Sequence, residues 1–96
     1  MAFIRTVRFT ADPADADQVL ARRAALIAAV RAGFPGLAET RLTRIDEGTW
    51  ADHWRWNSRA EMDAVIAAGP SLPEAKSAFE VVKDASVELG ELVDER

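Results

Sequence analysis

The sequence contains no cysteine and no tyrosine, and only one histidine, His53. The absence of cysteine excludes disulfides, thiolate metal ligands and a cysteine nucleophile. A single histidine without cysteine also argues against a zinc site of the usual composition. No apolar run is long enough to cross a bilayer, and arginines interrupt the N-terminal segment where a signal peptide needs unbroken apolar residues. We therefore expect a cytoplasmic protein that does not enter the membrane.

Positive charge is scarce as well. The 12 lysines and arginines are outnumbered by 16 aspartates and glutamates, which gives a formal net charge of −4. Phosphate binding needs a basic stripe and none is present, so we expect neither nucleic acid nor an acidic membrane as a partner. The 96 residues, 49% of them hydrophobic, are enough for one modest core. We expect a single domain over residues 1–96.

Alternation of apolar and polar residues with a period of two predicts four strands, over residues 3–9, 38–45, 50–56 and 86–93. Helical signals lie between them. An aspartate followed by proline at 12–13 predicts the start of a first helix that runs to about Ala32. The capping box Ser58-Arg59-Ala60-Glu61 predicts a second helix, and a further helical segment is expected to start at Pro73 after a glycine-proline break.

This order of strand, helix, strand, strand, helix and strand predicts the ferredoxin-like α+β fold, βαββαβ. In that fold an antiparallel four-stranded sheet carries both helical stretches on one face. The other face of the sheet needs a cover. Because so short a chain has no element left to provide one, we expect a homodimer in which two copies stack sheet against sheet, as a dimeric α/β barrel.

All three tryptophans lie in one predicted strand, at alternate positions with an aspartate among them: Trp50, Asp52, Trp54 and Trp56. Side chains at alternate positions of a strand share a face, so these four point the same way. Three indoles bury a large apolar area, whereas a carboxylate taken out of water without a partner is strongly disfavoured. Asp52 therefore needs either an ion-pair partner or a chemical role.

Two arginines also lie among apolar residues. Arg5 is on the apolar face of the first strand, and Arg23 is in the middle of the apolar stripe of the first helix. If these surfaces meet the tryptophan face, two cations and Asp52 converge beneath the helices. Such a group is either a closed structural network or the polar part of a ligand pocket, and the sequence favours neither interpretation.

The turn at 46–48 joins the second and third strands in an antiparallel hairpin. A two-residue loop predicts the pairs Ile45 with Trp50, Thr43 with Asp52, and Arg41 with Trp54. The lone histidine is then expected on the opposite face, as a hydrogen-bonding residue at the interface between two copies, together with Leu42, Arg44 and Arg55.

Two sequence passages, in this order of elements, resemble the antibiotic biosynthesis monooxygenase domains of the dimeric α/β-barrel group. One is the turn Phe34-Pro35-Gly36-Leu37 between the first helix and the second strand. The other is Trp56-Asn57-Ser58-Arg59-Ala60-Glu61-Met62, which is similar to the family's strand-end tryptophan followed by a serine-initiated helix. The resemblance covers nearly the whole chain. It implies a homodimer with a cavity between sheet and helices in each subunit. The oxidising members of the family react aromatic polyketide-like substrates with molecular oxygen and use no metal, flavin or haem.

The resemblance also carries over to single residues. Trp56 matches the family's pocket tryptophan, and Lys76 stands in for a pocket arginine on the later helix. Asp52 and Met62 take positions where anthrone-oxidising members have an asparagine and a tyrosine. Haem-degrading relatives need a histidine in the helix after the tryptophan strand, and residues 58–82 contain none, so haem degradation is not expected.

Two functions remain open at this stage. The first is a cofactor-independent monooxygenase, or a proton-transferring isomerase, that acts on a small aromatic or polyketide-like molecule with Asp52 as the base. Its candidate catalytic residues are Asp52, Trp56 and Arg23. Its candidate substrate contacts are Trp54, Met62, Arg5 and Lys76. The alternative is a non-catalytic dimeric module of the same fold that binds a small molecule or supports a partner protein.

Overall fold

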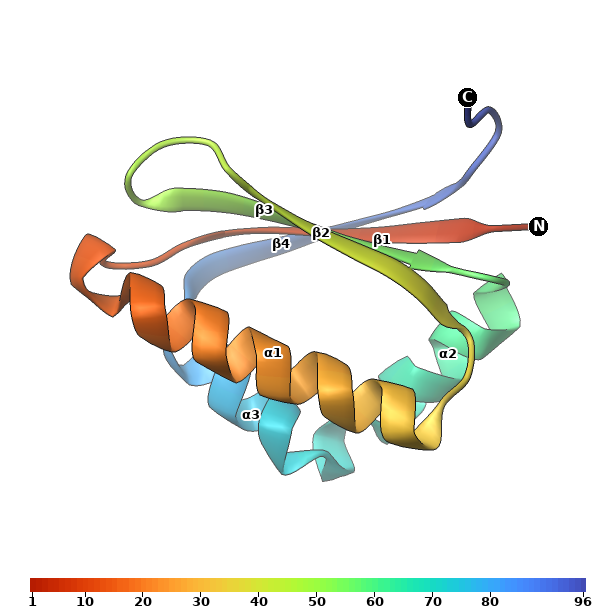
Figure 1. Cartoon of the computed structure of the whole chain (residues 1–96), viewed down its shortest axis with the longest axis horizontal. Coiled ribbons are helices and arrows are strands. Elements are labelled where there is room, and N and C mark those ends of the chain that lie inside the picture. The colour runs from red at the N-terminus through yellow and green to blue at the C-terminus, as the bar shows by residue number, and fades with distance from the viewer.

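A computed structural model describes all 96 residues and contains one antiparallel sheet with three α-helices (Figure 1). The elements follow in the order β1 Phe3–Thr10, η1 Pro13–Asp15, α1 Ala16–Gly33, β2 Leu37–Arg44, β3 Thr49–Trp56, α2 Arg59–Ala68, η2 Gly69–Ser71, α3 Pro73–Glu80 and β4 Lys83–Glu91, where η1 and η2 are single turns of 3₁₀ helix. The strands lie side by side in the order β2-β3-β1-β4. The ferredoxin-like α+β fold predicted from the sequence is therefore confirmed.

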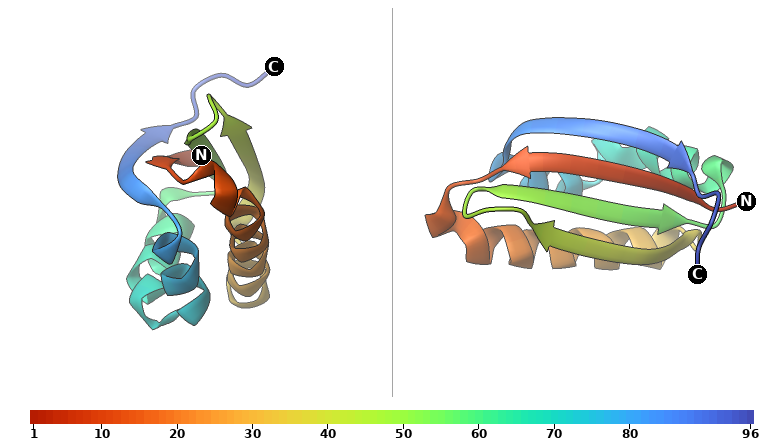
Figure 2. Two further views of the ribbon diagram at one scale, coloured as in Figure 1. Left: turned by 90° about the vertical axis from the view of Figure 1, so that its left-hand side faces the viewer. Right: turned by 90° about the horizontal axis from the view of Figure 1, so that it is seen from above.

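The helices lie on one face of the sheet, and the other face carries no helix (Figure 2). The central strands β1 and β3 pair along their whole length, from Phe3 opposite Trp56 to Thr10 opposite Thr49. β4 lies at one edge of the sheet, and all of its residues are exposed. The face that the helices cover is the one that holds the buried side chains of β1 and β3.

The helix starts follow the capping signals, with one difference. Ser58 caps α2 as predicted, since its hydroxyl accepts a hydrogen bond from the Glu61 backbone N–H at 3.2 Å. Asp12 caps the 3₁₀ turn η1, accepting from the Ala14 N–H at 2.9 Å, so α1 itself begins only at Ala16. None of the helices combines the length and the apolar character that crossing a membrane requires.

The hairpin register differs from the prediction by one residue. β3 pairs instead through Arg44 with Trp50, Leu42 with Asp52 and Thr40 with Trp54. The cause is the loop: the Asp46 carboxylate accepts from the Gly48 N–H at 3.0 Å, and the Ile45 N–H donates to the Thr49 carbonyl at 2.8 Å, which closes a three-residue loop. Hydrogen bonds to the Asp46 carboxylate, from the Thr49 side chain first and then from the Gly48 N–H, lower the pKa of Asp46.

One extra loop residue reverses the face of the β2 side chains from Glu39 to Arg44, and a second register shift lies between Leu37 and Glu39. Leu42 and Arg44, predicted at the dimer interface, therefore point toward the helices. Leu42 packs near Trp50, and the Arg44 guanidinium lies 4.3 Å from the centre of that indole ring. His53 does lie on the uncovered face, where its Nδ1 is 3.0 Å from the Thr6 hydroxyl.

The core consists of two hydrophobic clusters along the tryptophan strand. The first contains Trp54 and Trp56, packed with Val30, Leu37, Met62 and Val65. The second surrounds Trp50 near the hairpin, with Val7, Phe9, Ala11 and Val19. Trp56, Met62 and Val30 are the largest side chains that are fully buried. The tryptophan face therefore points toward the helices, as predicted.

The two passages that carry the family resemblance meet in space. The Asn57 N–H, just after β3, donates to the Gly36 carbonyl at 2.9 Å. The Glu61 side chain lies so close to Gly36 that no Cβ would fit there. Glycine in the turn is thus required by the close approach of the turn to the first turn of α2.

Candidate active site

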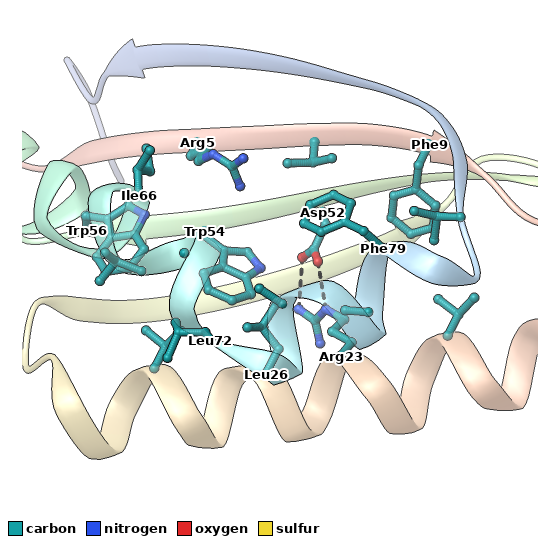
Figure 3. A pocket seen from close by; sticks show the side chains of 18 residues that line it. Arg5, Phe9, Arg23, Leu26, Asp52, Trp54, Trp56, Ile66, Leu72 and Phe79 are labelled. Carbon is teal, nitrogen blue, oxygen red and sulfur yellow. Dashed lines mark hydrogen bonds and ion pairs between the residues drawn. The ribbon is translucent and has the colours of Figure 1, made fainter.

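A cavity of about 190 Å³ lies between the sheet and the helices (Figure 3). Eighteen residues line it, and 14 of them are hydrophobic. The charged side chains in the lining are Arg5, Arg23 and Asp52. A largely apolar hollow with a few convergent polar groups is the usual form of a small-molecule site.

Each wall of the cavity comes from a different element. Alternation along β1 and β3 directs Arg5, Val7 and Phe9 and then Asp52, Trp54 and Trp56 into it. The apolar stripe of α1 contributes Val19, Arg23, Leu26 and Val30. The remaining wall comes from α2, α3 and the segments that follow each of them, with Val65, Ile66, Gly69, Leu72, Ala75, Ala78, Phe79 and Val82.

Asp52 forms a bidentate ion pair with Arg23 across the cavity. Arg23 Nε donates to one carboxylate oxygen and Nη2 to the other, each at 3.0 Å (Figure 3). The two side chains retain only 13% and 19% of their accessible surface, for Asp52 and Arg23 respectively. This geometry holds a carboxylate in an apolar surrounding, because the guanidinium compensates its charge through two parallel hydrogen bonds.

Arg5 points from β1 into the same cavity but has no such partner (Figure 3). Its strand neighbours are Trp54 on one side and Leu89 on the other, and its guanidinium makes no hydrogen bond or ion pair within the chain. Burial lowers the pKa of the Arg5 guanidinium, and the nearby Asp52 carboxylate offsets this in part. With Asp52 compensated by Arg23, the lining carries one uncompensated positive charge.

Two indoles form the wall at the C-terminal end of β3. The rings of Trp54 and Trp56 have their centroids 6.1 Å apart and are tilted by 39°. The Trp56 Nε1–H is buried without a hydrogen-bond partner. Trp50 lies outside the cavity and stacks on Phe9 at 6.3 Å, so it serves packing, as its place near the hairpin suggests.

The structure brings five of the seven predicted site residues to the cavity: Asp52, Trp56, Arg23, Trp54 and Arg5. Met62 is fully buried in the core beside Trp56 and does not line the cavity, because the first turn of α2 is packed directly against β3. Lys76 is exposed on α3 and lies outside the lining. No three His, Asp or Glu side chains of the chain gather into a group that could hold a metal ion.

Sequence reasoning missed the contribution of Ile66, Leu72 and Phe79 to the cavity. Ile66 and Phe79 are 45% exposed, which places them at its mouth. Their apolar spacing along the helical segments gave a signal for a packed face. It did not show that this face leaves a space above the sheet.

No family model and no curated protein matches the sequence, but several solved structures share its architecture. SnoaB, a cofactor-independent oxygenase from Streptomyces nogalater, is 21% identical with a TM-score of 0.74, over 98% of this chain and 95% of that one. A candidate antibiotic biosynthesis monooxygenase from Caulobacter crescentus is 22% identical with a TM-score of 0.74, over 97% and 91%. Rv0793 from Mycobacterium tuberculosis is 20% identical with a TM-score of 0.72, over 99% and 98%.

These similarities span nearly the whole chain. Because the sequence identities are low, the similarities establish the backbone arrangement alone. They agree with the resemblance seen in the turn, the strand-end tryptophan and the serine-capped helix. The chain has the fold of the antibiotic biosynthesis monooxygenases.

Proposed function

We propose that this protein is a cofactor-independent monooxygenase that acts on a small aromatic molecule held between the sheet and the helices. The observation that carries the proposal is the cavity itself: two indoles and a compensated carboxylate lie on its walls, in a surrounding that is otherwise apolar. An aromatic ring can stack on Trp54 and Trp56, while its polar groups reach Asp52 and the two arginines.

The cavity size limits the ligand. Its volume is about 190 Å³. An engineered apolar cavity of about 150 Å³ holds benzene, and sites for drug-sized ligands measure about 300–1,000 Å³. We therefore propose a ligand of one or two rings. A larger polyketide would have to extend through the mouth beside Ile66 and Phe79.

The proposed chemistry starts with removal of a proton. Asp52 accepts two hydrogen bonds from Arg23, but a carboxylate has about four lone-pair sites and retains acceptor capacity for a phenolic hydroxyl. The resulting phenolate has carbanion character at the ring carbon para to the oxygen. Arg5 and Arg23 stabilise the negative charge. Molecular oxygen takes electrons from that carbon and bonds to it, and the resulting peroxide takes the proton back from Asp52. The hydroperoxide then loses water to leave a quinone carbonyl.

A bicyclic phenol gives a direct test. 1,5-Dihydroxynaphthalene (C₁₀H₈O₂) and O₂ would give 5-hydroxy-1,4-naphthoquinone (C₁₀H₆O₃) and H₂O, so one oxygen atom enters the product and the other leaves as water. The reaction is run in the dark with ¹⁸O₂, and the quinone is analysed by mass spectrometry. Enzyme-dependent product with one ¹⁸O atom is expected. Binding of the phenol without turnover would contradict an oxygenase that accepts this substrate.

The alternative is a non-catalytic binding module, and one specific observation favours it. Both oxygens of Asp52 already accept hydrogen bonds from Arg23, as in a closed structural pair. Asp52→Asn separates the two functions, because it keeps the shape of the side chain and removes the negative charge. Loss of turnover with ligand binding retained supports Asp52 as the base. Full turnover in Asp52→Asn would rule that role out.

We also propose that the protein is a homodimer. In its support, one face of the sheet carries no helix, and β1 and β3 present Ile4, Thr6 and Arg55 on that face. Stacking two such faces would cover both sheets. Sedimentation equilibrium is expected to give twice the chain mass at micromolar concentration. A monomer throughout the concentration range would contradict this proposal without affecting the cavity.

A further inference from the structure

The cavity contains one charge that the protein leaves without a partner. Asp52 is matched in charge and in geometry by Arg23, which uses two donors for its two oxygens. Arg5 is then an additional cation in the same lining, and its cross-strand neighbours are an indole and a leucine. The chain has 16 acidic residues, and none of them forms an ion pair with Arg5.

A guanidinium in this position is unfavourable unless something compensates it. Side-chain burial removes part of its hydration, and the charge of Asp52 is already shared with Arg23. A neutral aromatic ligand would displace the remaining water and leave Arg5 less compensated than before. A ligand with its own negative charge would restore both the hydrogen bonds and the charge balance.

The direction of the side chains adds to this argument. In Figure 3 the Arg5 guanidinium and the indole nitrogen of Trp54 point toward the same part of the cavity, next to the Asp52–Arg23 pair. Neither the guanidinium nor the Trp54 N–H donates a hydrogen bond within the chain. Donors from two adjacent strands thus converge on one place, with ring-stacking surface beside it.

We infer that the natural ligand is an aromatic carboxylate of one or two rings, whose carboxylate binds Arg5 and the Trp54 N–H while its ring lies against Trp54 and Trp56. This inference rests on the proposed small-aromatic site and specifies its ligand class. The proposed reaction also needs a phenolic hydroxyl near Asp52, so the ligand carries both groups. A carboxylate matches Arg5 better than a second hydroxyl would, since it is ionised at neutral pH and matches the fork of a guanidinium with two parallel hydrogen bonds.

The test compares two ligands of the same shape that differ in charge, 2-naphthoate and 2-naphthamide, by isothermal titration calorimetry. The protein is expected to bind the acid about 10- to 100-fold more tightly than the amide, as charge-assisted hydrogen bonds in a desolvated site imply. In Arg5→Met this preference is expected to disappear or reverse. Arg5→Lys, which keeps the charge and loses the fork, is expected to retain part of it.

Arg8 provides a matched control. It lies on the same strand, points to the uncovered face opposite Ala51, and is exposed. Arg8→Met also removes one positive charge from β1 and is expected to leave the preference unchanged. The preference is also expected to persist at about 1 M salt, where the Debye length is about 3 Å and surface attraction is screened. A preference that salt abolishes, or that Arg8→Met removes equally, would overturn the assignment to Arg5.

The outcomes separate this inference from the proposed function. Equal binding of acid and amide to the unmodified protein overturns the carboxylate inference and leaves the aromatic site standing. Absence of binding for both naphthalenes, together with the absence of 1,5-dihydroxynaphthalene binding, overturns both. Because the acid-to-amide ratio is measured first on the unmodified protein, a variant that fails to fold does not decide the result.

Discussion

Arginine–carboxylate ion pairs lie on both faces of the central strands β1 and β3, but only one of the two faces is covered by helices. On the helix-covered face, Arg23 and Asp52 form an ion pair in which each side chain retains less than one fifth of its accessible surface. On the uncovered face, Arg55 contacts Glu39 at 3.4 Å and Glu95 at 3.3 Å, and these three side chains retain 31–56% of theirs. Water therefore solvates the charged groups on the uncovered face and is largely excluded from those on the helix-covered face. The same substitution should therefore have much larger consequences under the helices.

The largest effect is expected for Asp52→Ala, which leaves the Arg23 guanidinium buried without its partner. We expect a loss of about 3–4 kcal/mol in the free energy of unfolding, in the lower part of the range for broken buried pairs, because Arg23 keeps some contact with water. Urea denaturation followed by tryptophan fluorescence measures this. A loss below about 1 kcal/mol, the magnitude of a surface pair, would mean that the two faces do not differ as described.

The double variant Arg23→Met with Asp52→Leu sharpens the same comparison. Replacing both charges by apolar side chains removes the unpaired charge, so most of the lost stability should return. If Asp52 is the catalytic base, this stable variant still lacks turnover. Recovery of turnover together with stability would assign Asp52 to structure alone.

A second prediction compares the effects on stability of two residues that were predicted to contact substrate and lie outside the cavity lining, the buried Met62 and the exposed Lys76. Met62→Ala is expected to lower the free energy of unfolding by about 2–3 kcal/mol, because the side chain is fully buried and its loss leaves a void. Lys76→Ala, on the exposed side of α3, should change it by less than about 0.5 kcal/mol. Both are measured by urea denaturation. A small effect for Met62→Ala would show that Met62 borders space, as the sequence prediction assumed.

The helix-covered face of β1 and β3 could be predicted because its pattern is strong. Three indoles at alternate positions can only be buried together, and this fixes which way Asp52 points. β2 has no comparable set, since leucine, threonine and arginine alternate without one clearly apolar face. Its orientation therefore depends on the loop, where the hydrogen bond from Gly48 to Asp46 sets a three-residue length that the residue types alone did not reveal.

The cavity shows a second limit of the sequence. Arg5, Arg23 and Asp52 could be predicted to converge, because each is a charge within an apolar pattern. Which arginine pairs with Asp52 depends on the height of α1 above the sheet, and no local pattern encodes that distance. For the same reason the sequence did not reveal that Ile66 and Phe79 border an open space.

A third prediction concerns the turn that joins the covered layer to the sheet. Gly36→Ala is expected to lower the free energy of unfolding by about 1–2 kcal/mol, because the new Cβ would overlap the Glu61 side chain. Gly33→Ala is the matched control: nothing lies within 4 Å of its added Cβ. That change should stabilise the protein by about 0.4–1 kcal/mol through the unfolded state. Equal effects at the two glycines, measured by thermal unfolding, would contradict the close packing of the turn on α2.

Among the ion pairs, the smallest effect is expected on the uncovered face, for Glu39→Gln. The hydrogen bond from Arg41, and then the attraction of Arg41 and Arg55, lower the pKa of Glu39 below its ordinary value of 4.5. A carboxylate with a lowered pKa in the folded state contributes stability that is complete above the unfolded-state pKa and is lost as the pH falls through the folded-state pKa. The stability difference between the unmodified protein and Glu39→Gln should therefore be present at pH 7 and vanish in acid below pH 4.5.

Urea denaturation at a series of pH values measures this difference, and Glu47→Gln on the same hairpin serves as the control because Glu47 forms no ion pair. Added salt should reduce the Glu39 effect, since exposed pairs are screened. The Asp52 effect should respond much less to salt, because its pair is enclosed by apolar side chains. The contrary outcome is a loss of stability in Glu39→Gln that equals the loss in the Asp52 variant and resists salt. It would mean that a second copy covers this face in solution. The Arg55–Glu39 pair would then be as enclosed as the Arg23–Asp52 pair is under the helices.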